Sequence, residues 1–144
     1  MKVMVINGPN LNMLGIREKG VYGEETFDDL IKYIKEEGEK SGHQIEFFQS
    51  NIEGEIINSI QRAYFENFDG IVINPGAYTH YSYAIHDAIK GSNIKTVEVH
   101  ISNIHTREEF RKVSVTASAC IGQISGFGFY GYIMGLNALE NALK

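Results

Sequence analysis

The chain has 144 residues, a length that fits one domain with a sizeable core. Hydrophobic residues make up 43% and charged residues 22% of the chain, a composition that is typical of folded proteins and argues against a disordered chain. The net charge of −5 and the lack of a Lys/Arg-rich run argue against a nucleic-acid binder. We therefore predict a single domain over residues 1–144.

The cysteine content and the length of the apolar runs bear on the cellular location of the protein. Cys120 is the only cysteine, so no intrachain disulfide can form, which suits a reducing environment. The opening segment MKVMVINGPN has too short an apolar run for a signal peptide. No segment approaches the roughly 20 apolar residues of a membrane span. These features predict a cytoplasmic protein without a membrane partner.

Short apolar runs alternate with amphipathic segments in the first half of the chain. A buried strand is predicted over residues 3–6, followed by turn residues from Asn7. Thr26 and Asp29 then form an N-terminal capping pattern for a helix. Its apolar face carries Phe27, Leu30, Ile31 and Ile34. A second strand is predicted over residues 45–48, and a second helix has Ile56, Ile60, Ala63 and Tyr64 on one face.

The second half of the chain repeats this alternation. Strands are predicted over residues 70–73, 96–99 and 119–124, the last of which contains Cys120 as a core residue. A helix between the first two of these strands ends near Gly91. The glycine-rich residues 126–131 form a strand-to-helix turn, and the last helix presents Leu136, Leu139 and Leu143.

This order of elements determines the fold class. Apolar strands that alternate with helices indicate a parallel sheet covered on both faces, and hence an α/β protein. Five strands in this length predict a flavodoxin-like three-layer fold with the strand order 2-1-3-4-5. Ligands of such sheets bind beyond the carboxyl ends of the strands. The segments to inspect are therefore residues 7–25, 74–80 and 100–111.

The first of these segments is long for a connection between a strand and a helix, and long loops often bind ligands or close over them. Tyr22 lies in it, five residues after Arg17. A phenol with a pKa near 10 is a poor base, but a nearby guanidinium favours the phenolate. Taken alone, the pair is more typical of a surface charge and a packing tyrosine.

The second segment begins with Asn74, directly after a predicted strand. Its amide would project into the crevice, and Gly76 would let a ligand approach the backbone. The alternative is an ordinary Asn-Pro-Gly turn, with Thr79 or His80 near the start of a helix. Turn chemistry alone favours that alternative.

The third segment contains the clearest functional pattern. Glu98 and His100 lie on the same face of a strand because side chains alternate. A carboxylate beside an imidazole fixes its tautomer and raises its basicity, so His100 can act as an acid. Ser102 and the neighbouring backbone N–H groups could hold a carboxylate, and Arg107 and Arg111 would share a helical face. The alternative is an edge Glu–His hydrogen bond beside a surface helix, but the position at the strand's carboxyl end favours function.

Other kinds of site have no support in the sequence. The five histidines are scattered without a metal-ligand spacing, so no metal site is predicted. Ser102 has no G-x-S-x-G context for a nucleophile, and no G-x-x-x-x-G-K-[ST] phosphate loop occurs.

Five motifs together resemble a known family. They are NGPNLNMLG over residues 7–15, R-E-x-x-x-Y-G over 17–23, NPGAYTH over 74–80, EVHISNIH over 98–105 and REEFR over 107–111. Their order and spacing, over nearly the whole chain, resemble type II 3-dehydroquinate dehydratase (3-dehydroquinase). The resemblance implies a hydro-lyase that converts 3-dehydroquinate to 3-dehydroshikimate in the shikimate pathway, without a cofactor or metal.

The resemblance also implies roles for particular residues. Tyr22, activated by Arg17, would remove the proton next to the ketone, and Asn10 would help to stabilise the enolate through a water. His100, oriented by Glu98, would protonate the departing hydroxyl. The residues implied to bind the substrate are Asn74, Ile101 and Ser102 at its carboxylate, His80 and Arg111 at its ring hydroxyls, and Asp87 from a neighbouring subunit. Members of this family form trimers that assemble into a dodecamer.

The chain departs from the family pattern at several positions. Tyr81, Ile52 and Val113 replace residues that are common in the family, and His86 stands where an arginine before the aspartate is customary. None of these changes removes an implied catalytic group. A titratable histidine in place of an always-charged arginine does bear on the subunit contact around Asp87.

Two alternatives keep the fold and change the function. One is another enzyme of the same fold that acts on a different carboxylate. The other is a flavodoxin-like small-ligand binding module without catalysis, which would need a Ser/Thr-rich phosphate loop where this chain has residues 7–10. A receiver-type signalling domain would need a phosphorylatable aspartate where Asn74 stands.

Overall fold

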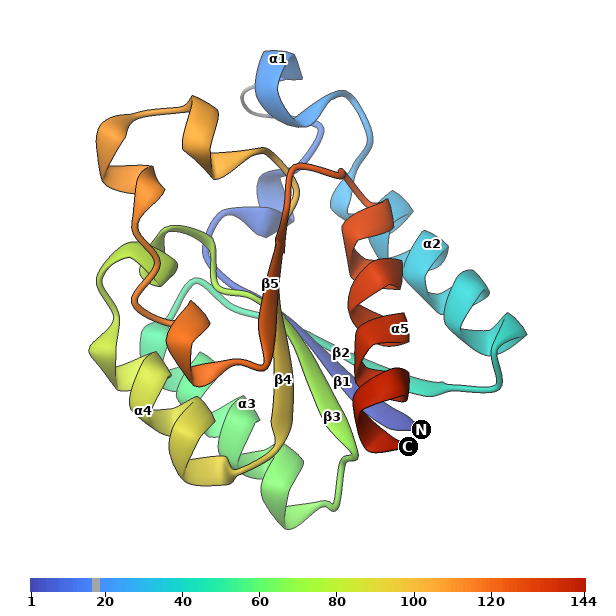
Figure 1. The fold of residues 1–144 in the computed structure, drawn as a ribbon. Helices are drawn as coiled ribbons and strands as arrows, with labels where there is room; N and C mark the ends of the chain where they lie inside the picture. Colours follow the sequence, from blue (N-terminus) through green and yellow to red (C-terminus); the bar gives the residue numbers. More distant parts are fainter. Residues whose placement is uncertain (17–18) are drawn as a thin grey trace.

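The architecture is a five-stranded parallel sheet between two layers of helices (Figure 1). The computed structural model describes residues 1–16 and 19–144, without the side chains of Lys19 and Tyr22. The strands are β1 (Lys2–Asn7), β2 (Gln44–Gln49), β3 (Gly70–Asn74), β4 (Lys95–His100) and β5 (Gly122–Ser125). The α-helices are α1 (Lys19–Tyr22), α2 (Phe27–Lys40), α3 (Glu53–Phe65), α4 (Tyr83–Ser92) and α5 (Tyr130–Leu143).

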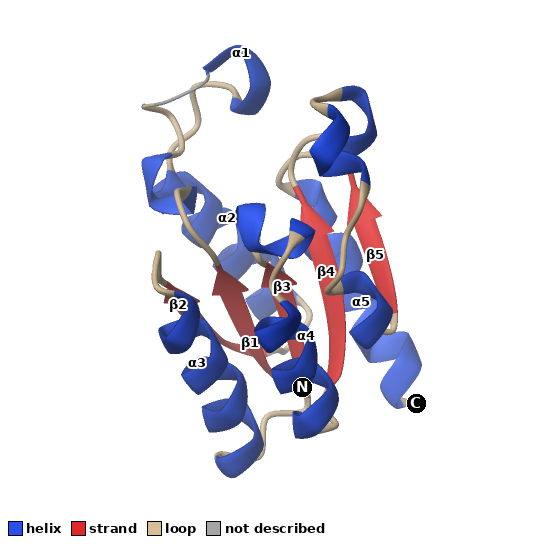
Figure 2. Cartoon of the chain, turned by 90° about the vertical axis from the view of Figure 1, so that its left-hand side faces the viewer, coloured by secondary structure: helices blue, strands red, loops and turns tan. Residues whose placement is uncertain are grey.

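The sheet has the predicted strand order, β2-β1-β3-β4-β5, and every adjacent pair is parallel. Helices α2 and α5 cover one face, and α3 and α4 cover the other (Figures 1 and 2). Because both faces are buried, β1 and β3 consist almost entirely of buried residues. The flavodoxin-like α/β prediction is therefore confirmed.

The helices begin where the sequence supplies caps. Thr26 and Asp29 form a reciprocal capping box at the start of α2, with N···O distances of 2.9 and 3.2 Å. Ser82 caps α4 through the amide of Ile85, at 3.0 Å. Both caps fix the point at which a loop on the carboxyl side of the sheet becomes a helix.

Three packing and boundary predictions were wrong. Residues 117–119 form a 3-10 helix, and β5 begins only at Gly122, so half-buried Cys120 precedes the strand. Tyr64 is 57% exposed because it lies about 80° around the α3 axis from buried Ile56. Leu143 is 40% exposed in the last turn of α5, one residue before the end of the chain.

The connections after β1 and β3 are in close main-chain contact at the carboxyl edge of the sheet. The amide of Gly8 donates to the carbonyl of Asn74 at 2.7 Å. A Cβ atom at Gly8 would lie 2.4 Å from the carbonyl oxygen of Pro75, closer than any side chain allows. Only glycine therefore permits this close approach of the two main-chain segments. Together they form the base, or floor, of the pocket at the carboxyl edge of the sheet.

Short 3-10 helices fill the remaining connections, and all but the last of them lie on the carboxyl side of the sheet. They are η1 (Leu11–Met13), η2 (Gly76–His80), η3 (Ile104–Thr106), η4 (Glu109–Lys112) and η5 (Ala117–Ala119). In Figure 2 the strand arrows point towards the end of the molecule where α1 lies. No helix among the described residues has the length and apolar character needed to cross a membrane.

Candidate active site

A pocket opens at the carboxyl edge of the sheet, beyond β1, β3 and β4. It encloses about 570 Å³ of empty space that includes open solvent, a size that suits a small ligand. The site residues predicted from the sequence that line it are Asn10, Asn74, His80, His100, Ile101, Ser102 and Arg111. Three segments far apart in the sequence thus converge on one cavity, as expected for this fold.

His100 and Glu98 form a buried pair beneath this pocket. The imidazole Nε2 lies 3.1 Å from Oε2 of Glu98, and Glu98 is fully buried while His100 is 6% exposed. The pair lies on one face of β4, as strand alternation predicts, while Val97 and Val99 pack into the opposite core. Because β4 lies between β3 and β5, the pair is internal to the sheet and the interpretation as an edge contact was wrong.

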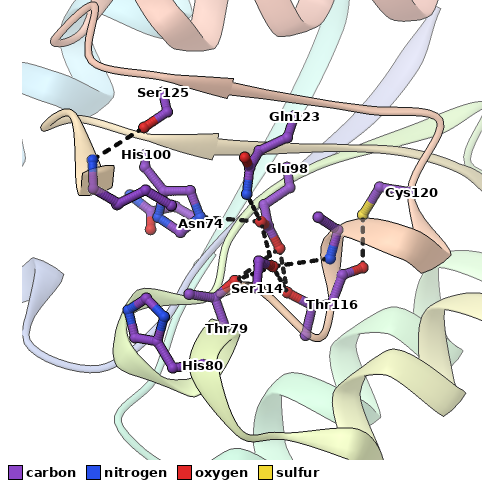
Figure 3. Close-up of polar contacts among 12 residues, drawn as sticks. Asn74, Thr79, His80, Glu98, His100, Ser114, Thr116, Cys120, Gln123 and Ser125 are labelled. Carbon is purple, nitrogen blue, oxygen red and sulfur yellow. Dashed lines mark hydrogen bonds and ion pairs between the residues drawn. The ribbon is translucent and has the colours of Figure 1, made fainter. Parts of the chain in front are cut away.

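Glu98 also receives bonds from four other side chains (Figure 3). Thr79 and Thr116 contact Oε1, the former at 3.1 Å. Ser114 and Gln123 donate to Oε2 at 2.9 and 2.6 Å. Burial raises the pKa of Glu98, but the bond and charge of His100 and the bonds from Thr116 and Gln123 outweigh burial and lower it. The neighbouring imidazole and the hydrogen bonds therefore favour the charged form of the carboxyl.

Asn74 is fixed by a second buried polar cluster. Its Nδ2 donates to the hydroxyl of Tyr132 on α5 at 2.9 Å, and its Oδ1 accepts from the amide of Gly76 at 3.1 Å. The same tyrosine donates to Oδ1 of Asn7 at 2.6 Å. Asn74 thus forms part of a turn and also lines the pocket, so the turn and the binding interpretations are compatible.

His80 lies on η2 at the rim of the pocket. Its Nδ1 is 2.7 Å from the carbonyl oxygen of Val113, and its ring packs edge-on to Phe110. Burial lowers the pKa of His80, the Val113 carbonyl partly offsets this, and the charge of Arg111 lowers it further. A neutral ring at this position can both donate and accept a hydrogen bond.

Arg111 reaches the pocket from η4, with its guanidinium bonded to Glu108 and placed 4.8 Å from the ring centre of Phe110. Arg107 ends η3 and lies outside η4. The predicted shared helical face of Arg107 and Arg111 was therefore wrong. Two separate 3-10 turns replace one helix, and both arginines still line the pocket.

Ser102 and Asn10 complete the described lining. The hydroxyl of Ser102 lies 3.5 Å from a guanidinium nitrogen of Arg107. Asn10 adopts a left-handed backbone with φ 69°, and its amide donates to Oδ1 of Asn51 at 3.0 Å. Asparagine tolerates this conformation better than most residues, and Asn10 and Leu11 at the start of η1 line the pocket.

Three predicted site residues are not among the pocket-lining side chains that the structure describes. Arg17 falls outside the described residues, and the side chain of Tyr22, the last residue of α1, does too. Asp87 has an 81% exposed side chain on α4, beside His86 at 3.2 Å, and borders a different hollow with Tyr64 and Phe65. Its predicted contact with a neighbouring subunit stays a prediction.

This combination of fold, pocket and motif positions matches one family. The model of the class II dehydroquinase family matches residues 1–140. The chain belongs to this family.

Similar proteins agree with the class II dehydroquinase assignment. The 3-dehydroquinate dehydratase of Clostridium beijerinckii is 72% identical over 140 residues, which cover 97% of this chain and 96% of that protein. The 3-dehydroquinate dehydratase of Clostridium perfringens is 71% identical over the full length of both chains. The crystal structure of a type II dehydroquinase from Butyrivibrio crossotus is 58% identical, covers 97% of each chain and superposes with a TM-score of 0.95.

The sequence of this dehydroquinase did not reveal most of the residues that surround the Glu98–His100 pair. The side chains that bond to Glu98 lie on η2, on β5 and in the segment after η4. The local sequence around Thr79, Ser114 and Thr116 contains no pattern that predicts these contacts. Gln123 could have been found, because it lies directly opposite Glu98 in the β4–β5 register. Within residues 1–16 and 19–144, no group of three or more His, Cys, Asp or Glu side chains forms a candidate metal site.

Proposed function

We propose that this chain is a type II 3-dehydroquinate dehydratase, a hydro-lyase of the shikimate pathway that needs no cofactor. The observation that carries the proposal is the buried Glu98–His100 pair beneath a polar pocket, in a chain of this family. The reaction removes a proton next to the substrate ketone and then a hydroxyl as water, giving 3-dehydroshikimate.

His100 supplies the acid in this mechanism. Hydroxide leaves poorly, so a positioned acid must transfer a proton to the departing oxygen, and such catalysis contributes about 10²–10⁴-fold. The bond from Nε2 to Glu98 turns the other ring nitrogen away from the carboxylate and stabilises the protonated ring.

Tyr22 supplies the base, with Arg17 as its activator. A guanidinium near the phenol favours the phenolate. The position of α1 supports this assignment, because Gly20 and Val21 share a hollow with Ile101 and Ser102 of the pocket. The proton leaves the substrate for the phenolate oxygen, and the electron pair moves onto the ketone oxygen as an enolate. Asn10 stabilises that enolate through a water.

The remaining pocket residues hold the substrate. Asn74, Ser102 and the backbone at Ile101 bind the substrate carboxylate, while His80 and Arg111 bind ring hydroxyls. Because Nδ1 donates to the Val113 carbonyl, the neutral state favoured for His80 leaves Nε2 to accept a hydrogen bond from a substrate hydroxyl. The positive charge of Arg111 in the pocket wall attracts the negatively charged substrate.

We further propose a homo-oligomer, a dodecamer built of trimers, in which Asp87 reaches a neighbour's pocket. Its exposed carboxylate beside a hollow lined by Tyr64 and Phe65 supports an intersubunit contact. Light scattering of the purified protein tests this: twelve chains per particle are expected, and a monomer would contradict it. The predicted cytoplasmic location is tested separately by fractionation of cells that make the protein.

The dehydration assay tests the activity. Incubation with 3-dehydroquinate should produce an ultraviolet-absorbing enone without added metal. His100→Gln and Tyr22→Phe should each lower kcat by about 10²-fold or more. The exposed residues His105 and Tyr130 provide matched controls, His105→Gln and Tyr130→Phe, that should keep wild-type turnover. Near wild-type turnover of Tyr22→Phe, or a substrate–lysine adduct trapped by borohydride, would exclude this mechanism.

A further inference from the structure

The Glu98–His100 pair shares one proton when His100 is ready to act as an acid. Either the proton sits on the imidazole, giving a carboxylate and an imidazolium, or it sits on Glu98, giving two neutral groups. An imidazolium is a far stronger acid than a neutral imidazole, so only the first arrangement suits the proposed reaction. Burial penalises two charges, and the neutral arrangement therefore competes in a site where Glu98 is fully buried.

The side chains around Glu98 bear on this competition. The hydroxyl of Ser114 accepts from the amide of Ala117 at 3.0 Å and donates to the carboxylate at 2.9 Å. Thr116 is fully buried and contacts the other carboxylate oxygen. The Nε2 group of Gln123 can only donate. Hydrogen bonds of this kind stabilise the charged form of a carboxyl over its neutral form.

We propose that Thr116 and Gln123 are positioning residues that keep the shared proton on His100 rather than on Glu98. This proposal rests on the proposed function, since it concerns the acid of that reaction. Neither residue lines the pocket, so both act through Glu98. The lowered pKa of the Glu98 carboxyl, to which both residues contribute, agrees with the proposal.

Two other titratable groups face this cluster. Burial raises the pKa of the Cys120 thiol to about 12, with a further contribution from the charge of Glu98, so the thiol is neutral. His80 lies on η2 with Thr79, and its lowered pKa favours its neutral form too. The charge balance at the centre of the cluster therefore depends on Glu98, His100 and the donors that surround them.

The two proposed residues differ in how cleanly they can be tested. Gln123 is exposed on β5, so Gln123→Met removes the donor with little disturbance of the core. Thr116→Val replaces a buried hydroxyl with a methyl group, and Thr116→Ser restores the hydroxyl. Gln44→Met, on the exposed surface of β2 at the opposite edge of the sheet, is the matched control for the glutamine substitution.

The experiment reads the proton position directly. Nitrogen NMR of histidine-labelled enzyme, assigned with His100→Gln, measures the imidazolium fraction, and carbon NMR of labelled glutamate carboxyls, assigned with Glu98→Gln, measures protonation of Glu98. In Gln123→Met and Thr116→Val we expect the ratio of imidazolium to neutral imidazole at His100 to fall about tenfold, while Glu98 takes up the proton. The kcat plateau should fall with KM nearly unchanged, and Thr116→Ser should recover both readouts.

An unchanged imidazolium signal in Gln123→Met would overturn the proposal, as would a wild-type pair that is already neutral. A lower kcat in Thr116→Val without movement of the proton would show a merely structural role and would also overturn it. If the wild-type chain fails to dehydrate 3-dehydroquinate, the proposed function fails instead, and the NMR result still reports where the proton lies.

Discussion

Two buried polar clusters lie at the carboxyl edge of the sheet. They differ in how much stability is lost when one of their polar groups has no hydrogen-bond partner. The cluster around Glu98 carries a charge, and five side chains contact its carboxylate. The cluster of Asn7, Asn74 and Tyr132 is neutral and leaves Nδ2 of buried Asn7 without a hydrogen-bond partner in the described structure. An unpaired neutral amide costs about 1–3 kcal/mol, whereas an unpaired buried charge costs far more. The charged cluster therefore needs its full set of donors.

The largest expected effect comes from removing the charge of the first cluster. Glu98→Gln replaces the carboxylate with an amide that cannot stabilise an imidazolium, so kcat should fall by about 10²-fold or more while KM changes little. Steady-state kinetics measure this, with Glu39→Gln on the exposed surface of α2 as the control. Wild-type kcat in Glu98→Gln would mean that His100 acts without its carboxylate.

The neutral cluster should respond mainly in stability. Tyr132→Phe removes the hydroxyl that joins Asn7 and Asn74 and leaves both buried amides short of a partner. The free energy of unfolding should fall by about 1–3 kcal/mol, and KM should rise more than kcat falls because Asn74 is proposed to hold the substrate. Urea denaturation measures the first effect. A stability equal to that of exposed Tyr130→Phe would show that the cluster contributes nothing.

The pH dependence of stability distinguishes the clusters further, because burial raises the pKa of Tyr132 and only Glu98 titrates in acid. The folded-state pKa of Glu98 lies below the ordinary value of 4.5, so its stabilising contribution is complete above the ordinary value. This contribution is lost as the pH falls through the lowered folded-state pKa. The difference in unfolding free energy between wild type and Glu98→Gln should shrink as the pH falls below 4.5. Parallel curves down to pH 3 or so would contradict the lowered pKa.

The smallest effect is expected at the margin of the charged cluster. The thiol of Cys120 lies 3.5 Å from the carbonyl oxygen of Thr116, and its pKa of about 12 keeps it neutral. Cys120→Ala removes only a weak donor, so the unfolding free energy should change by less than about 1 kcal/mol and kcat should stay near the wild-type value. A large loss of kcat would place the thiol among the groups that set the charge balance.

Local sequence rules were sufficient for the elements and for one half of the charged cluster. Strand alternation alone placed Glu98 and His100 together, and the capping pattern of Thr26 and Asp29 located the start of α2. The class, the strand order and the carboxyl-edge site followed from the alternation of apolar strands and helices.

Contacts between distant segments could not be predicted in this way. Asn74 and Tyr132 are 58 residues apart, and Thr79 and Thr116 are 37 apart, so no local periodicity connects them. The boundary of β5 was missed because its apolar residues begin before the chain enters the sheet. The face shared by Arg107 and Arg111 was misjudged because helical spacing was assumed where two tight turns occur.

The contact between Gly8 and Pro75 limits how this enzyme could be redesigned. Since backbone meets backbone there, the floor of the pocket is set by two main-chain segments and not by the side chains above them. Libraries that vary Ser102 or Arg111 to accept other hydroxy acids can therefore keep the same main-chain base of the pocket. A library that varies residue 8 would lose the floor itself, because every added Cβ atom forces the two connections apart.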